Sequence, residues 1–269
     1  MITPEHKEQV LDDLQERLAI IASGVPMVEL GEVFQELCLG FQASGICSLL
    51  LQADAADLHR NLQRSGHARR YFLRKSLEQQ SQDSVFVALS RTEALLDVIA
   101  CGDWALAGEL QRWSPQAWLP DGEYESDFCY YALLHAYLGR TGSAFDVQAA
   151  LPWLSRFEQA LGTYFDLRLP LCQRFFEPEL DVAAFWEAFE DFVEEQVRVA
   201  AAPVYDDASW IEPRRFVSVE GLAWLALAAS RGLVAPALEY ALCPSWARAP
   251  AASPQGADLL VQIEQQFGL

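Results

Sequence analysis

The chain has 269 residues, of which 52% are hydrophobic and 21% charged, a composition that is typical of a globular protein and argues against intrinsic disorder. Its 38 Asp and Glu residues against 19 Lys and Arg give a formal net charge of -19. Nucleic acids and anionic membranes are not expected as partners, because a protein that binds either must neutralise it with a basic surface. The acidity favours a positively charged macromolecule as partner, or else serves solubility alone.

The cysteines and the first residues bear on the cellular compartment. The six cysteines are irregularly spaced and contain no Cys-x-x-Cys pair, which predicts free, mostly buried thiols. They are Cys38, Cys47, Cys101, Cys129, Cys172 and Cys243. The opening residues MITPEHKEQV carry no basic segment followed by an apolar stretch, and the run GLAWLALAA near the C-terminus is about half of a membrane span. We therefore expect a cytoplasmic protein.

Apolar residues recur at helical spacing along most of the chain, and alternating β-branched runs are nearly absent, so the sequence predicts an all-α fold. The first helix is expected to begin at Thr3 and Pro4, a capping residue followed by proline, and to end at Ser23 and Gly24. Further helices are expected over residues 29–42, 46–64, 67–80, 83–101, 103–112, 125–138, 146–161, 181–200, 218–231 and 256–267.

The break between two of these helices indicates how they pack. Gly102 can adopt the left-handed conformation that ends a helix, and Asp103 can cap the next one, so the connection is about two residues long. Helices joined so tightly pack antiparallel. Similar breaks recur without a fixed period, which predicts an irregular multi-helix bundle of antiparallel hairpins, helical-repeat-like, in a single domain over residues 1–269. A Pro/Ala/Ser-rich connector at about 244–254 precedes the final helix.

Charge is concentrated in two segments. In the helix at 181–200 one face is apolar, and the other carries a row of carboxylates that we call the acidic stripe. The acidic stripe consists of Glu187, Glu190, Asp191, Glu194 and Glu195, and such a face is either solvated or a binding surface. The basic cluster from Arg60 to Lys75 is expected to pair with carboxylates on a neighbouring helix or across a dimer interface.

Three carboxylates stand directly ahead of an apolar helix in EYESDFCYYALLHAYLG, residues 123–139. Glu123, Glu125 and Asp127 are placed at the first turn, where unpaired N–H groups and the helix dipole favour negative charge. The helix behind them is apolar nearly all round, which predicts a central position in the core. His135 is expected to be a core histidine with a hydrogen-bond partner, because the four histidines lack the spacings of a metal site.

No signature of a known reaction occurs in the sequence. A glycine-rich phosphate loop, a G-x-S-x-G elbow and a Glu-x-x-His pair are all missing. Cys129 is a poor candidate for a reactive thiolate, because the neighbouring carboxylates raise the pKa of its thiol. We expect no catalytic residue, no metal and no cofactor, with an enzyme of dispersed site kept as an alternative.

Three stretches, in this order, resemble the immunity protein 49 family of bacterial polymorphic toxin systems. They are TEALLDVIACGDWALAGEL, EYESDFCYYALLHAYLG and RRFVSVEGLAWLALAASRGL. The resemblance implies a cytoplasmic antidote that binds and neutralises a cognate toxin or effector domain. It implies an inhibitor rather than an enzyme, and it carries no catalytic residues over to this chain.

The interface is predicted from the residues themselves. Two long loops, 112–123 and 202–216, combine proline, tryptophan and acids, and long loops in compact domains are more often functional than short ones. With the acidic stripe they supply the candidate partner-binding residues: Trp118, Asp121, Glu123, Tyr124, Glu125, Glu187, Asp191, Glu194, Tyr205, Asp206, Asp207 and Trp210. Each aromatic residue has edge-of-core packing as its alternative role. A helical adaptor for another protein is the second hypothesis, and the sequence leaves homodimer formation open.

Overall fold

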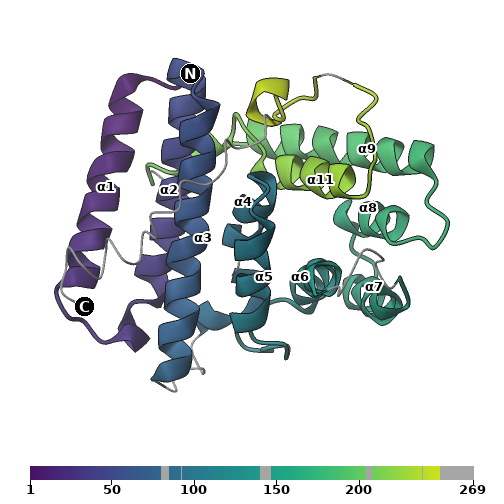
Figure 1. Cartoon of the computed structure of the whole chain (residues 1–269), viewed down its shortest axis with the longest axis horizontal. Coiled ribbons are helices and arrows are strands. Elements are labelled where there is room, and N and C mark those ends of the chain that lie inside the picture. The colour runs from purple at the N-terminus through teal and green to yellow at the C-terminus, as the bar shows by residue number, and fades with distance from the viewer. Residues whose placement is uncertain (80–84, 92, 140–146, 204–207, 238, 249–269) are drawn as a thin grey trace.

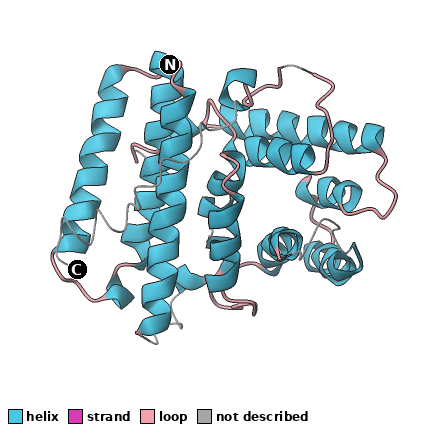
Figure 2. Cartoon of the chain, in the orientation of Figure 1, coloured by secondary structure: helices cyan, strands magenta, loops and turns pink. Residues whose placement is uncertain are grey.

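A computed structural model describes residues 1–79, 85–91, 93–139, 147–203, 208–237 and 239–248, and this part of the chain is all-α, without a β-strand (Figure 2). Its helices are α1 (Pro4–Ala22), α2 (Gly31–Gln52), α3 (Ala55–Glu78), α4 (Glu93–Ala100), α5 (Trp104–Trp113), α6 (Glu125–Leu138), α7 (Val147–Leu161), α8 (Arg168–Phe175), α9 (Val182–Ala201), α10 (Ile211–Arg214) and α11 (Val219–Ser230). Short 3-10 turns lie at Met27–Glu29, Val85–Val87, Leu89–Arg91 and Ser245–Arg248. The predicted bundle of antiparallel hairpins is confirmed.

The first three helices lie side by side and antiparallel along one edge of the molecule (Figure 1). Ala53, in the left-handed conformation with φ 53°, ends α2, and the Asp54 side chain accepts from the Asp57 backbone N–H at 2.9 Å to begin α3. By length and composition α2 could cross a membrane, but 78% of that apolar stretch is buried against the rest of the protein. In this fold α2 is a core helix.

The tight connection predicted at Gly102 and Asp103 is confirmed: α4 and α5 form a hairpin that joins the two halves of the bundle. Gly102 has φ 74°, and Asp103 accepts from the Leu106 N–H at 3.0 Å to cap α5. On one side the hairpin packs against α3, and on the other α4 packs against α11 and α5 against α6. Figure 1 shows α6 and α7 nearly end-on, with α8 between them and the pair α9 and α11. Buried aromatic rings fill this half, among them Tyr130, Phe175 and Trp224.

The predicted breaks inside α2 and α3 are wrong. Both Gly45 and Gly66 lie within helices, where they permit close approach of a neighbouring helix. A Cβ atom on Gly45 would lie 3.1 Å from the Leu58 backbone, and one on Gly66 would lie 2.1 Å from a Val98 methyl carbon. The expected helix at 83–101 is shorter, α8 and α10 were not predicted, and the expected helix at 256–267 lies outside the described residues.

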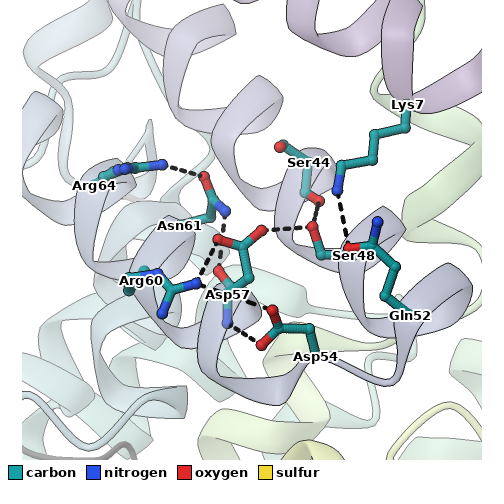
Figure 3. A network of polar contacts seen from close by, with 9 residues as sticks. All are labelled: Lys7, Ser44, Ser48, Gln52, Asp54, Asp57, Arg60, Asn61 and Arg64. Carbon is teal, nitrogen blue, oxygen red and sulfur yellow. Dashed lines mark hydrogen bonds and ion pairs between the residues drawn. The ribbon is translucent and has the colours of Figure 1, made fainter.

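The basic residues of α3 are engaged within the fold. Figure 3 shows the start of α3, where the Asp57 carboxylate accepts from Ser48 at 2.5 Å and from Arg60 at 3.0 Å. Further along, Arg70 donates to Glu109 of α5 at 2.6 Å. This bond confirms, for Arg70, the prediction that the basic cluster pairs with carboxylates on a neighbouring helix.

All six cysteines are buried and unpaired, as predicted. Burial raises the pKa of the Cys38, Cys101 and Cys243 thiols to about 12 and that of the Cys129 thiol to about 11. The thiol is therefore the dominant form of these side chains at neutral pH, which makes them poor nucleophiles.

Candidate functional site: a polar cavity where helix starts meet

A cavity of about 500 Å³ opens between the N-terminal ends of α4, α6, α8 and α11, with the C-terminal end of α9 and helix α10 as its other walls. Six charged residues line it: Glu93, Asp127, Arg168, Arg214, Arg215 and Glu220. Its size falls within the range of small-ligand sites, roughly 300 to 1,000 Å³. The cavity is therefore lined by charges of both signs and has a volume typical of ligand-binding sites.

Local sequence places three of these acids at helix starts. Glu93 is the first residue of α4, and Asp127 lies in the first turn of α6. Ser218 caps α11 by accepting from the Gly221 N–H at 3.0 Å, which puts Glu220 in the first turn of that helix. Carboxylates are favoured there by the helix dipole and the unpaired N–H groups.

Arg168, the first residue of α8, is the centre of the ion-pair network. Its Nε donates to both Asp166 carboxylate oxygens, at 3.1 and 3.0 Å, and its Nη2 donates to Asp127 at 2.7 Å. The guanidinium also lies 4.9 Å from the centre of the Tyr130 ring. Burial lowers the pKa of Arg168, but the hydrogen bonds and charges of the surrounding carboxylates outweigh burial and raise it well above its usual value.

Glu220 and Tyr131 both line the cavity. Burial raises the pKa of Glu220, while Arg168 and a hydrogen bond from Tyr130 oppose this effect. Trp224 donates its Nε1–H to the Tyr130 oxygen at 3.0 Å, which leaves the Tyr130 hydroxyl proton for Glu220. Burial, followed by the charges of Glu93 and Glu220, raises the pKa of Tyr131 well above its usual value.

The remaining arginines tie α10 to its neighbours. Arg214 pairs with Glu93 of α4 at 2.7 Å. Arg215 donates to the carbonyls of Ala200 and Ala202, at 2.6 and 3.2 Å, where α9 ends. These bonds satisfy carbonyls that the helix terminus leaves unpaired, so both guanidiniums already serve the fold.

The first predicted loop is anchored by its own residues. The Glu123 carboxylate accepts from the Ser90 N–H at 2.7 Å and from the Leu119 N–H at 3.2 Å. The half-buried Trp118 donates to the Glu123 carbonyl at 3.2 Å and packs against the core. Glu125 pairs with Arg156 of α7 at 2.7 Å. Trp118, Glu123 and Glu125 thus hold the loop in place.

Two of the predicted partner-binding residues in and beside this loop remain at the surface. Asp121 is exposed, and Tyr124 is 80% exposed. They line a second hollow of about 450 Å³ next to the first, since the two hollows share Ser90 and Asp127 in their walls. The structure therefore brings the first predicted loop to the rim of the polar cavity.

The second predicted loop lines the polar cavity itself. Trp210 immediately precedes α10 and packs against the core, while Ile211, Arg214 and Arg215 line the cavity. Tyr205, Asp206 and Asp207 lie outside the described residues.

The acidic stripe belongs to a different surface. Its members Glu187, Asp191 and Glu194 are exposed, as is Glu190, and Glu195 pairs with Arg198. At 100° per residue these carboxylates lie opposite the buried face of α9, which is also the side that contributes Val199 to the cavity. The stripe therefore points away from the cavity and the loops.

Sequence reasoning missed Arg168 and Glu220, two charged residues that line the cavity. Ser218 as a capping residue followed by an acid in the first turn is a helix-start signal that could have placed Glu220 at the front of α11. Nothing local to Arg168 marks its pairing with Asp127, which is 41 residues away.

His135 lies in the core as predicted, at 2% exposure, but the expected hydrogen bond is not found. Neither ring nitrogen has a partner among the described residues, and burial lowers the pKa of His135 to about 3. The described residues also contain no group of three or more His, Cys, Asp or Glu side chains placed to hold a metal ion.

Comparisons with protein-family models, with curated proteins and with solved structures give no match. The resemblance to the immunity protein 49 family therefore stays a hypothesis that rests on the three quoted stretches.

Proposed function

We propose that this chain is a toxin-neutralising immunity protein that binds a cognate toxin or effector domain and occludes it stoichiometrically. The observation that supports the proposal most directly is the position of the two predicted loops. The two loops are about ninety residues apart in the sequence, yet Asp121 and Tyr124 line the second hollow, next to the polar cavity that Arg214 and Arg215 line. A partner that covers this region contacts both loops at once.

The surface has the two properties that an antidote needs. A net charge of -19 accelerates encounter with a basic partner, because complementary potentials raise association rates by one to three orders of magnitude. The exposed Tyr124 beside Asp121 is an aromatic anchor of the kind that slows dissociation. Since Glu123 and Trp118 fix the loop, its ordering costs little on binding.

An enzyme with a dispersed site is the second candidate function. The observation that favours it is that two titratable groups with raised pKa values, Glu220 and Tyr131, line one cavity, a pattern common in active sites. Turnover of a small molecule by the isolated protein would support this reading over the inhibitor.

The proposal is tested by co-expression with a toxin-domain protein encoded next to this gene. We expect growth to be rescued and a one-to-one complex to co-purify. Tyr124→Ala should weaken the complex by at least about tenfold, as for an interface anchor. Tyr164→Ala is the matched control, because Tyr164 is similarly exposed, at 83%, but lines neither hollow. Absence of both rescue and binding would refute the proposal.

A further inference from the structure

We infer that the polar cavity receives an organic cation with several N–H donors, a guanidinium or an ammonium group, on the Glu220 carboxylate and the Tyr131 hydroxyl. The proposed function would supply this cation as an arginine or lysine side chain of the toxin. The same chemistry could also come from a small free amine or guanidine, and the experiment below separates the two sources.

The cations that already line the cavity are committed to protein partners. Arg168 is bound by Asp166 and Asp127, and Arg214 by Glu93. Arg215 is held by backbone carbonyls at the end of α9 and by Glu212. An incoming anion would therefore have to displace a carboxylate from a guanidinium, which makes anion binding unfavourable.

Two hydrogen-bond acceptors that line the cavity, in contrast, can accept further hydrogen bonds. Tyr131 is 5% exposed and lines the cavity, yet among the described residues no hydrogen bond reaches its hydroxyl. Glu220 receives one hydrogen bond from Tyr130, and a carboxylate can accept about four. Because Tyr131 lines the cavity, its hydroxyl is available there to a ligand or to water.

The charge around these acceptors also favours a cation. Burial raises the pKa of Tyr131, and the carboxylates of Glu93 and Glu220 raise it further. At the Tyr131 hydroxyl the effect of these negative charges is therefore larger than the opposing effect of Arg168. Burial likewise raises the pKa of Glu220, and an arriving cation would stabilise the ionised carboxylate. A guanidinium presents up to five planar N–H donors, which matches neighbouring carboxylate and hydroxyl acceptors.

The first test uses the free protein and needs no toxin. N-acetyl-arginine amide and N-acetyl-lysine amide are titrated into ¹⁵N-labelled protein, with N-acetyl-glutamine amide as the neutral control ligand. We expect saturable shifts of the Tyr131 and Glu220 amide signals with the cationic probes only. Absence of saturable shifts at these positions, or equal shifts with the neutral probe, would overturn the inference.

Two variants and one control connect the binding to the named groups. Glu220→Gln should lower the affinity for the cationic probes about tenfold, since it removes a charge-assisted hydrogen bond. Tyr131→Phe should lower it about fivefold without loss of fold, because the hydroxyl makes no bond to a described residue. Glu190→Gln removes an exposed carboxylate of the acidic stripe and should change nothing. Equal affinities of the original protein and its Glu220→Gln, Tyr131→Phe and Glu190→Gln variants would overturn the inference. If Glu220→Gln proves unstable, an unchanged affinity of Tyr131→Phe would still overturn it.

The second test identifies the source of the cation. If the toxin supplies it, Tyr131→Phe and Glu220→Gln weaken the toxin complex in the same order as they weaken probe binding. If the probes bind but both variants hold the toxin as the original protein does, the cavity takes a small free cation. Failure of the proposed function is distinguishable, because the unaltered protein then binds no toxin while the probe titration still reports on the cavity.

Discussion

Asp97 on α4 offers the sharpest check on the electrostatics of this fold. Its side chain is 1% exposed and accepts from Gln42 at 2.6 Å and from the Ser65 hydroxyl. Burial raises the pKa of Asp97 from 3.8 to about 7, although both hydrogen bonds act to lower it. The folded protein therefore holds this proton to a higher pH than the unfolded chain does.

The sign and size of the effect follow from linkage. Because the native pKa of Asp97 is raised, its contribution to stability is fully present below about pH 4 and is lost as pH rises towards 7. One pKa unit corresponds to roughly 1.4 kcal/mol, so burying this carboxylate lowers the free energy of unfolding by about 4 kcal/mol above pH 7. Asp97→Asn removes the titration, and its amide can accept from Gln42 and donate to Ser65.

The measurement is the free energy of unfolding in urea, by tryptophan fluorescence, for both proteins from pH 5 to pH 8. We expect the free energy of unfolding of Asp97→Asn, relative to that of the original protein, to rise by roughly 3 kcal/mol between pH 5 and pH 8. Most of this rise should occur below pH 7. Asp121→Asn, in the exposed loop, reports the effect of removing a carboxylate at the surface. A stability difference between Asp97→Asn and the original protein that is independent of pH would refute the reasoning.

Two further predictions concern packing and charge. Gly66→Ala should destabilise the fold by roughly 1 to 3 kcal/mol, because the new methyl would lie 2.1 Å from a Val98 carbon, whereas Gly108→Ala, with open space around it, should stabilise by about 0.5 to 1 kcal/mol. Urea unfolding checks both, and equal effects would contradict the close-packing argument. Reversing two stripe charges, Glu187→Lys with Glu194→Lys, should slow toxin association most at low salt and leave dissociation unchanged in stopped-flow measurements. Slower association that is indifferent to salt would count against steering.

The sequence predicts helices well where periodicity and caps coincide and fails where glycine has a packing role. The segment 125–138 matches α6, and Asp103 caps α5 as expected. Gly45 and Gly66 lie in or next to the gaps between the predicted helices 29–42, 46–64 and 67–80, although glycine inside a helix can also serve close packing. Which of its two roles a glycine has depends on the neighbouring helix, and one sequence does not contain that information. The actual break, at Ala53, lacks a glycine altogether.

The candidate site was predictable only in its local parts. Acids at helix starts and the tryptophan-bearing loops are visible in the sequence, because a cap or a turn involves residues a few positions apart. The cavity depends on where four helix starts meet in space. Asp127 pairs with Arg168, which is 41 residues away in the sequence, and Glu93 pairs with Arg214, which is 121 residues away. Such pairings are properties of the packed bundle, and no spacing rule predicts them.

The three acids Glu123, Glu125 and Asp127 at the start of α6 show how charge is divided between the fold and the surface. Each has its own partner: Glu123 binds backbone N–H groups, Glu125 binds Arg156, and Asp127 binds Arg168. These carboxylates join α6 to its neighbours. Because each is paired, they add little negative electrostatic potential at the loop surface. Exposed negative charge is displayed by the acidic stripe on the far side of α9, where Glu195 alone pairs with Arg198 among the described residues. Under the proposed function, the stripe would attract a basic partner and the cavity would hold it, so substitutions in the stripe should alter association without changing dissociation.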